Sequence, residues 1–178
     1  MAEEEVIPAY LKKIDVGFDK SEGGYFDYEY VQFRYNGQNG VVDCQVHYVE
    51  GGLVYIVFAM TQDDYDSKYR AEVLEYANRA NQISQFAFMV VGSVEKKDDG
   101  SEKFSTWVKL SNADADTPSE VVIEAMIRNS CSMVSDYYPG LMKIVWGGMS
   151  ANDALDLVLS KEDEDRDNKP PPPISGYQ

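Results

Sequence analysis

The chain has only one histidine, His47, and two cysteines, Cys44 and Cys131, among its 178 residues. A conventional zinc site needs several closely spaced histidine or cysteine ligands, and a serine hydrolase needs a histidine that activates its nucleophile. The sequence contains no Cys-x-x-Cys pair, no Gly-x-Ser-x-Gly motif and no glycine-rich phosphate-binding loop. We therefore expect no metal, no cofactor and no catalytic residue of these kinds.

The two cysteines lie far apart in the sequence, within segments that are apolar enough to be buried. A disulfide between them is possible, but nothing in the sequence supports one. Buried cysteines in a chain of this size usually serve as small apolar core residues. We assign both to the core.

Long apolar runs and an excess of basic residues are also missing. No stretch of 18 apolar residues is present, and the amino terminus, Met-Ala-Glu-Glu-Glu, lacks the basic and apolar regions of a secretion signal. The 16 basic and 31 acidic residues give a formal charge of −15. Phosphate backbones and anionic lipids bind clustered lysine and arginine, so this charge disfavours both. We expect a cytoplasmic protein that binds neither nucleic acid nor membrane.

The first half of the chain contains a short helix followed by three strands. Residues 7–14 follow an acidic segment and are expected to be helical. Residues 25–35 are rich in aromatic and β-branched side chains, and the Asn-Gly turns that follow favour a hairpin. Residues 41–49 alternate between apolar and polar side chains, as in a strand buried on one face. Residues 53–60 are apolar at nearly every position, as in a central strand.

Helices dominate the second half. Apolar residues between Tyr69 and Ile83 recur at spacings of three and four, which predicts an amphipathic helix. Residues 86–94 and 103–110 are expected to pair as antiparallel strands through the turn at Asp99-Gly100. A helix with proline at its first position starts near Thr117. These segments predict an α+β fold in the order α-β-β-β-α-β-β-α-α, with an antiparallel sheet of about five strands packed by helices.

The domain is expected to span residues 1–160. Residues 161–178 are acidic and contain four consecutive prolines, Pro170 to Pro173, which indicates a disordered tail.

The segment from Asp136 to Leu159 contains several residues that are typical of helix ends and helix starts. Tyr138-Pro139-Gly140 is expected to break the preceding helix, and Gly147-Gly148 to end the short helical segment after it. Ser150 is expected to cap the last helix together with Asp153. Each of these roles is structural, so this segment is the closing corner of the fold and contains no reactive group.

Two polar groups are candidates for chemistry. His47 shares the polar face of its strand with Asp43, and we expect a surface histidine with hydrogen bonds rather than a catalytic one. Asn112, Asp114 and Asp116 alternate as in a calcium loop, but Thr117 replaces the required glycine and Ile123 the required carboxylate. We interpret this group as a solvated turn before a helix.

The tyrosine content of the first long strand is its most unusual property. An aromatic strand can pack into the core on one face and bind a partner on the other, because tyrosine combines apolar area with a polar tip. Burial of both faces under helices is equally compatible with the sequence. The candidate protein-binding residues are Tyr28, Tyr30, Phe33 and Tyr35.

The order of elements and several short motifs resemble the YbjN family of bacterial sensory transduction regulators. The motifs are the helical stretch from Tyr69 to Asn81, Phe86-Ala87, Tyr137-Tyr138-Pro139, Gly148-Met149-Ser150 and Ala154-Leu155. The resemblance covers residues 7–159 and implies the fold of type III secretion chaperones. It also implies a regulator or chaperone-like protein-interaction module, and it supplies no catalytic residues.

These observations favour a non-enzymatic module that binds a partner protein through an exposed sheet or helix face, and we expect a homodimer. Two alternatives stay open. One is a small-ligand-binding protein or enzyme that uses carboxylates and tyrosines, for example Asp43 with His47. The other is an acidic inhibitor, of the immunity-protein type, that neutralises a basic partner.

Overall fold

An antiparallel sheet with helices on one of its faces forms the structure, which is a computed structural model. The structure describes residues 6–21, 29–48, 55–61, 63–84, 87–112 and 119–168. Its helices are α1 (Val6–Lys13), α2 (Arg70–Ile83), α3 (Glu120–Gly147) and α4 (Ala151–Asn168), with a 3-10 turn at Ser67–Tyr69. The main strands are β1 (Asp19–Ser21), β2 (Glu29–Gly37), β3 (Gly40–Tyr48), β4 (Tyr55–Met60), β6 (Phe88–Val91) and β9 (Thr106–Asn112).

These six strands are ordered β1-β2-β3-β4-β9-β6, and every neighbouring pair is antiparallel. A second small sheet, β5-β8-β7, comprises Tyr65–Asp66, Glu102–Phe104 and Glu95–Lys96. The α+β class is confirmed. The main sheet has one strand more than the sequence predicted, because β1 is a three-residue edge strand, Asp-Lys-Ser, with no apolar alternation to reveal it.

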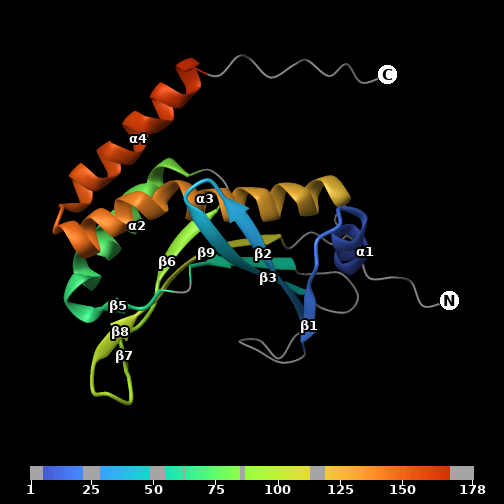
Figure 1. The fold of residues 1–178 in the computed structure, drawn as a ribbon, viewed down its shortest axis with the longest axis horizontal. Helices are drawn as coiled ribbons and strands as arrows, with labels where there is room; N and C mark the ends of the chain where they lie inside the picture. The colour runs from blue at the N-terminus through green and yellow to red at the C-terminus, as the bar shows by residue number, and fades with distance from the viewer. Residues whose placement is uncertain are drawn as a thin grey trace.

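The core lies between the sheet and α3, which crosses the sheet in Figure 1. The alternation predicted for β3 is confirmed: Val42, Cys44, Val46 and Tyr48 are buried and face the helices. We call this side of the sheet the inner face. One hydrophobic cluster includes residues from the inner face and from all four helices.

The predicted helix break at Tyr138-Pro139-Gly140 is wrong, because α3 is continuous from Glu120 to Gly147. Proline has no N–H group, so Pro139 leaves the carbonyl of Ser135, four residues earlier, without its helical donor. The β2–β3 hairpin supplies a replacement: the Asn39 side chain donates to the Ser135 carbonyl at 2.9 Å, and the Asn39 backbone N–H donates to the Ser135 hydroxyl at 3.0 Å. A contact distant in sequence therefore compensates for the proline.

Two glycines permit close contacts with α3. A Cβ atom at Gly37 would lie 2.6 Å from the Ser135 hydroxyl oxygen, so only glycine lets the hairpin approach the helix. At Gly140 a Cβ atom would lie 2.3 Å from the hydroxyl oxygen of Tyr76, a residue of α2 that is fully buried. That hydroxyl donates to the Tyr137 carbonyl at 2.9 Å. Residues Tyr137 to Gly140 thus form the part of α3 against which α2 packs.

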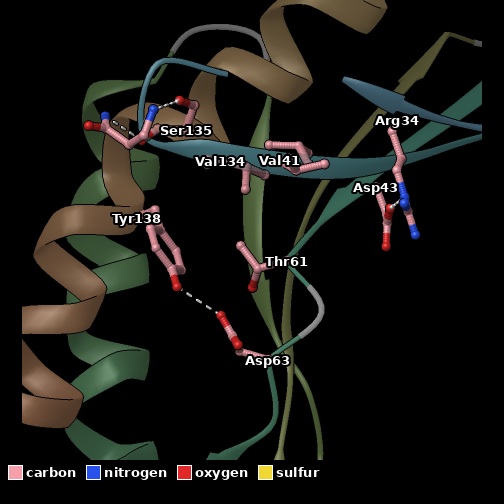
Figure 2. Close-up of a pocket in the computed structure, with 11 residues that line it drawn as sticks. Arg34, Val41, Asp43, Thr61, Asp63, Val134, Ser135 and Tyr138 are labelled. Carbon is pink, nitrogen blue, oxygen red and sulfur yellow. Dashed lines mark hydrogen bonds and ion pairs between the residues drawn. The ribbon is translucent and has the colours of Figure 1, made fainter. Parts of the chain in front are cut away.

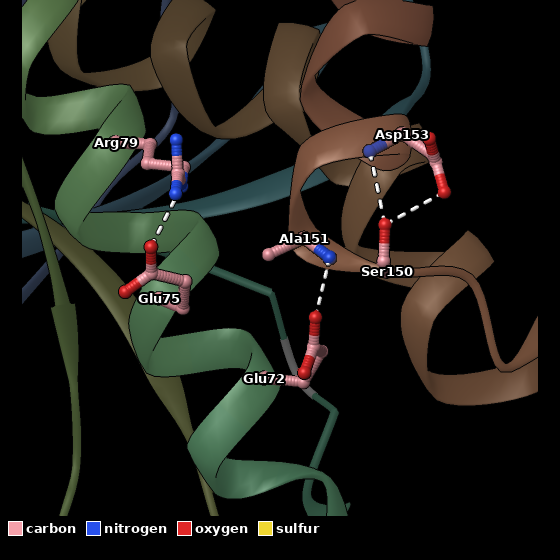
Figure 3. Close-up of polar contacts among 6 residues, drawn as sticks. All are labelled: Glu72, Glu75, Arg79, Ser150, Ala151 and Asp153. Carbon is pink, nitrogen blue, oxygen red and sulfur yellow. Dashed lines mark hydrogen bonds and ion pairs between the residues drawn. The ribbon is translucent and has the colours of Figure 1, made fainter.

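The expected end of α3 and start of α4 are confirmed. Gly148 adopts φ 62°, and its N–H donates to the Ile144 carbonyl. The Ser150 hydroxyl accepts from the Asp153 N–H at 3.2 Å (Figure 3). Glu72 of α2 adds a cap from outside the helix, because its carboxylate accepts from the Ala151 N–H.

Helix α4 continues to Asn168, past the boundary at residue 160 that the sequence suggested for the tail. Residues 161–168 contain no apolar residue, so no hydrophobic periodicity marked this part of the helix in the sequence. Residues 169–178 lie outside the described residues. In the part of the chain that the structure describes, no helix is long and apolar enough to cross a membrane.

Candidate functional site

The side of the sheet opposite α3, which we call the outer face, carries no helix among the described elements. The strand register places its side chains in three rows. The row nearest the β2–β3 hairpin runs from Arg34 and Asp43 to Met60, Trp107 and Val90. The outer face is mostly polar over β2 and β3 and mostly apolar over β4, β9 and β6, with Lys109 of β9 between Phe58 and Phe88 in the middle row.

The apolar part contains five residues that the structure leaves partly or largely exposed. Phe88 is the most accessible, at 54% exposure. We call this group, together with the adjoining Tyr30, the outer patch; its members are Tyr30, Phe58, Met60, Phe88, Val90 and Trp107. Aromatic residues and methionine are enriched in the buried centres of protein–protein interfaces. The outer patch consists of residues of these kinds and one valine, with Lys109 between Phe58 and Phe88.

The four candidate residues on the aromatic strand do not lie together. Tyr28 lies outside the described residues. Tyr30 is on the outer face, where its ring stacks on His47 with centroids 4.8 Å apart. Phe33 and Tyr35 are on the inner face: Phe33 is 8% exposed and part of the core, and Tyr35 packs against it. A strand alternates strictly between faces, so residues 30 and 33 could not share one surface.

His47 is not the surface histidine that the sequence suggested. It is 3% exposed, stacked on Tyr30 and met edge-on by Phe58 at 5.1 Å. Its Nε2 atom lies 3.2 Å from the Gln45 side-chain oxygen. Burial lowers the pKa of His47 below its ordinary value, because the charged ring would lose its hydration. The ring is therefore a neutral, packed element of the outer face.

Asp43 and His47 are separated on β3 by Gln45, whose side-chain oxygen meets the histidine ring. Asp43 forms an ion pair with Arg34 on β2, with 3.5 Å between Nε and Oδ1. The Asp43–His47 pair considered as a catalytic alternative is therefore replaced by two separate contacts.

A cavity of about 430 Å³ opens where the β2–β3 hairpin, the end of β4 and the middle of α3 meet (Figure 2). We call it the hairpin pocket. Thr61 and Asp63 come from the segment after β4, and Tyr138 comes from α3. The Tyr138 hydroxyl donates to the Asp63 carboxylate at 2.9 Å. Burial, followed by this contact with Asp63, raises the pKa of Tyr138. The other residues that line it are Arg34, Asn39, Gly40, Val41, Val42, Asp43, Val134 and Ser135.

The free edge of the sheet at β6 is closed to an added strand at Met89. The Asn81 side chain of α2 donates to the Met89 carbonyl at 2.9 Å and accepts from the Met89 N–H at 2.7 Å. Arg70 donates to the Gly92 carbonyl at 2.9 Å. A strand adds to a sheet edge through such backbone groups, so this edge is a poor docking site and the outer face is a better one.

Cys44 of the inner face and Cys131 of α3 are both fully buried and both reduced. A hydrogen bond with Cys131, and then burial, raise the pKa of the Cys44 thiol. Sequence alone did not predict that the two cysteines are neighbours. Their complete burial and the raised pKa of Cys44 are those of core thiols.

Among the described residues, no group of three or more histidine, cysteine, aspartate or glutamate residues could hold a metal ion. Asp114 and Asp116 of the calcium-like segment lie outside the described residues, and Asn112 ends β9.

Sequence reasoning missed most of the outer patch and the hairpin pocket. Phe88 and Trp107 lie on strands that the sequence predicted, but the register between β4, β9 and β6 places Trp107 beside Met60 and Phe88 beside Lys109. The pocket depends on contacts such as that between Asn39 and Ser135. No sequence pattern available from one chain contains that information.

Comparison with models of known protein families finds no match. Comparison with curated proteins finds none either. Comparison with solved structures does find similar chains.

One of these is YbjN. The crystal structure described as "YbjN, a putative transcription regulator from E. coli" aligns over 90% of this chain and 90% of that chain. The identity is 9% and the TM-score is 0.48. A likeness of this degree shows nothing about the function of this chain.

Proposed function

We propose that this protein is a non-enzymatic protein-interaction module, of the regulator or chaperone-like kind, and that the outer patch binds its partner. The observation that carries the proposal is the exposure of an aromatic and apolar surface on a sheet face that no described helix covers. Phe88 alone is 54% exposed at the centre of that surface's outer edge. Full burial of a phenylalanine side chain is worth about 1.5–3 kcal/mol, so burying the exposed half of Phe88 contributes about 0.8–1.6 kcal/mol to association.

The placement of the polar groups supports binding rather than catalysis. The histidine is buried between two aromatic rings, and its ring nitrogen meets an amide oxygen. The edge strand β6 is engaged by α2, which directs a partner to the face of the sheet and away from its edge.

Affinity capture from the source cell, followed by binding measurements with the purified partner, tests the proposal. The variant Phe88→Ser removes an exposed aromatic residue from the outer patch. Val121→Ser is the matched control, because Val121 is 75% exposed on α3, on the other side of the sheet. We expect a specific protein that wild type and Val121→Ser retain and Phe88→Ser loses. Equal retention by all three proteins would place the interface elsewhere.

Salt distinguishes this proposal from the acidic-inhibitor alternative. Apolar docking on the outer patch changes little with ionic strength, while association driven by the charge of −15 weakens steeply. We expect a dissociation constant that changes less than about threefold between about 0.05 and 0.5 M salt, because the patch residues are uncharged and Lys109, which lies between Phe58 and Phe88, adds only a small salt-dependent contribution.

We also propose that the protein is a homodimer. Sedimentation velocity tests this, because it distinguishes a species of 20.1 kDa from the expected species of twice that mass.

A further inference from the structure

The hairpin pocket has the size of a small-molecule site. Its volume of about 430 Å³ is within the range of ligand-binding clefts, which is roughly 300–1,000 Å³. It lies beyond the apolar outer patch, at the end of the sheet where β2 turns into β3. A ligand there would contact three segments that are distant in the sequence: the hairpin, the segment after β4, and α3.

The walls of the pocket are held in place by contacts that do not require a ligand. Asn39 donates two hydrogen bonds to Ser135, which fix the hairpin against α3. On the opposite wall the Thr61 hydroxyl lies 3.1 Å from the Tyr65 hydroxyl. A site preformed in this way binds a ligand without first ordering its own residues.

The charges of the pocket are not balanced. Arg34 and Asp43 form an ion pair with each other on one side of the pocket. Asp63 on the other side accepts a hydrogen bond from the uncharged Tyr138 hydroxyl, as Figure 2 shows. Its neighbour Asp64, which does not line the pocket, is paired with Lys97 at 2.9 Å. The lining residues thus carry one positive and two negative charges, which leaves a net charge of −1 at the side of Asp63.

The rest of the lining is mixed. Asn39, Thr61 and Ser135 are polar, Val41 and Val134 are aliphatic, and Tyr138 contributes an aromatic ring beside the carboxylate. A carboxylate next to an aromatic ring favours an ammonium group, which the carboxylate binds by charge-assisted hydrogen bonds and the ring by a cation–π contact. The overall charge of −15 raises the local concentration of cations and lowers that of anions.

We propose that the hairpin pocket binds a small organic cation, a primary amine with a short aliphatic body, whose ammonium group is held by Asp63 beside Tyr138 and whose body lies on Val41 and Val134. Arg34 is paired with Asp43, which offsets its charge and makes it a weaker anchor for an anion than an unpaired arginine would be. The site is independent of the outer patch, and either can exist without the other.

Three probes with the same carbon skeleton test the charge selectivity of the pocket: n-butylammonium, butan-1-ol and butyrate. Each is titrated into the full chain at low ionic strength while backbone amide chemical shifts are followed by NMR. We expect saturable shifts at Val41 and Asp63 with n-butylammonium, and none of comparable affinity with the alcohol or the acid. Equal binding of butan-1-ol, preferred binding of butyrate, or no saturable shift with the amine would overturn the proposal.

Two matched variants assign the charge to one residue. Asp63→Asn should weaken n-butylammonium binding about tenfold or more, because it removes a charge-assisted hydrogen bond. Asp64→Asn makes the same change of charge at the next residue, outside the pocket, and should change binding less than about twofold, since long-range charge effects are screened in part. An equal loss in both variants would show that the amine responds to the general field of the protein and not to a site.

Tyr138→Phe separates a binding role from a structural one. This variant removes the hydroxyl that holds Asp63 but keeps the carboxylate and the aromatic ring. We expect it to retain binding of n-butylammonium within about threefold, because the ring and the charge supply the recognition. If binding disappears in Tyr138→Phe while the fold is unchanged by circular dichroism, the ammonium is not held by Asp63 and the proposal fails.

Discussion

Replacement of Gly140 by alanine tests the packing of α2 against α3. By helix propensity alone, alanine in place of glycine inside a helix stabilises a protein by about 1 kcal/mol. In this structure the new Cβ atom would lie 2.3 Å from the Tyr76 hydroxyl oxygen, 2.8 Å from the ring carbon that bears it, and 3.0 Å from the Ala154 carbonyl oxygen. The two effects have opposite signs, so the sign of the measured change decides between them.

The magnitude follows from the burial of Tyr76. Overpacking in a core costs about 1–3 kcal/mol, and we take the upper end because the Tyr76 ring is fully buried and cannot turn away. After subtraction of the propensity gain, Gly140→Ala should lower the free energy of unfolding by about 2 kcal/mol. For a domain of this size the corresponding fall in Tm is about 4–8 °C.

The assay is urea unfolding of four proteins: wild type, Gly140→Ala, Tyr76→Phe and the double variant. Tyr76→Phe alone removes the hydrogen bond to the Tyr137 carbonyl and should cost about 1 kcal/mol. In the Tyr76→Phe background the hydroxyl oxygen is absent, so Gly140→Ala should cost about half as much as in wild type, a coupling of about 1 kcal/mol. If Gly140→Ala stabilises the protein, or lowers the free energy of unfolding equally in both backgrounds, the close packing of Tyr76 against Gly140 is wrong.

Three further predictions concern buried groups. The amide of Asn81 satisfies both backbone groups of Met89, so Asn81→Ala should destabilise the protein by about 1–3 kcal/mol in urea unfolding; a change below about 0.5 kcal/mol would be inconsistent with these two bonds. Cys44 and Cys131 should react with a maleimide, followed by mass spectrometry, only as fast as the protein unfolds, and rapid labelling of the native protein would contradict their burial. Burial lowers the pKa of His47 in the folded protein below its ordinary value of about 6.5, so the unfolded chain takes up the proton first as the pH falls. The free energy of unfolding should therefore decrease as the pH drops below about 6.5 and level off below the pKa of the folded state. Unfolding curves of His47→Gln should lack this part of the pH dependence, and an unchanged pH profile would refute the prediction.

Much of the fold follows from local patterns in the sequence. The alternation of β3 and the apolar spacing of α2 led to the correct elements, because side chains that repeat with the period of a strand or a helix must share one face. The caps at Gly148 and Ser150 were also predictable, since a left-handed glycine and a hydroxyl side chain have few other roles at a helix boundary.

The errors arise where a distant contact changes a local preference. Pro139 would end most helices, but Asn39 of the hairpin donates to the carbonyl that the proline leaves free, and α3 continues. The aromatic strand was assigned four candidate residues without regard to which face each occupies. Its register with β3 places Phe33 opposite Cys44 in the core and Tyr30 opposite His47 on the outer face. Strand pairing thus decided which face Phe33 and Tyr30 occupy.

The outer patch contains one of the two tryptophans of the chain, and the other provides an internal control. Trp107 lies in the patch on β9, and Trp146 is 82% exposed near the end of α3. Hydroxyl-radical footprinting of the captured complex, read by mass spectrometry, measures the oxidation of both side chains with and without the partner. We predict that the partner protects Trp107, Phe88 and Met60 from oxidation, while Trp146 is oxidised as readily as in the free protein. Protection of Trp146 with no change at Trp107 would contradict the claim that the sheet face binds the partner.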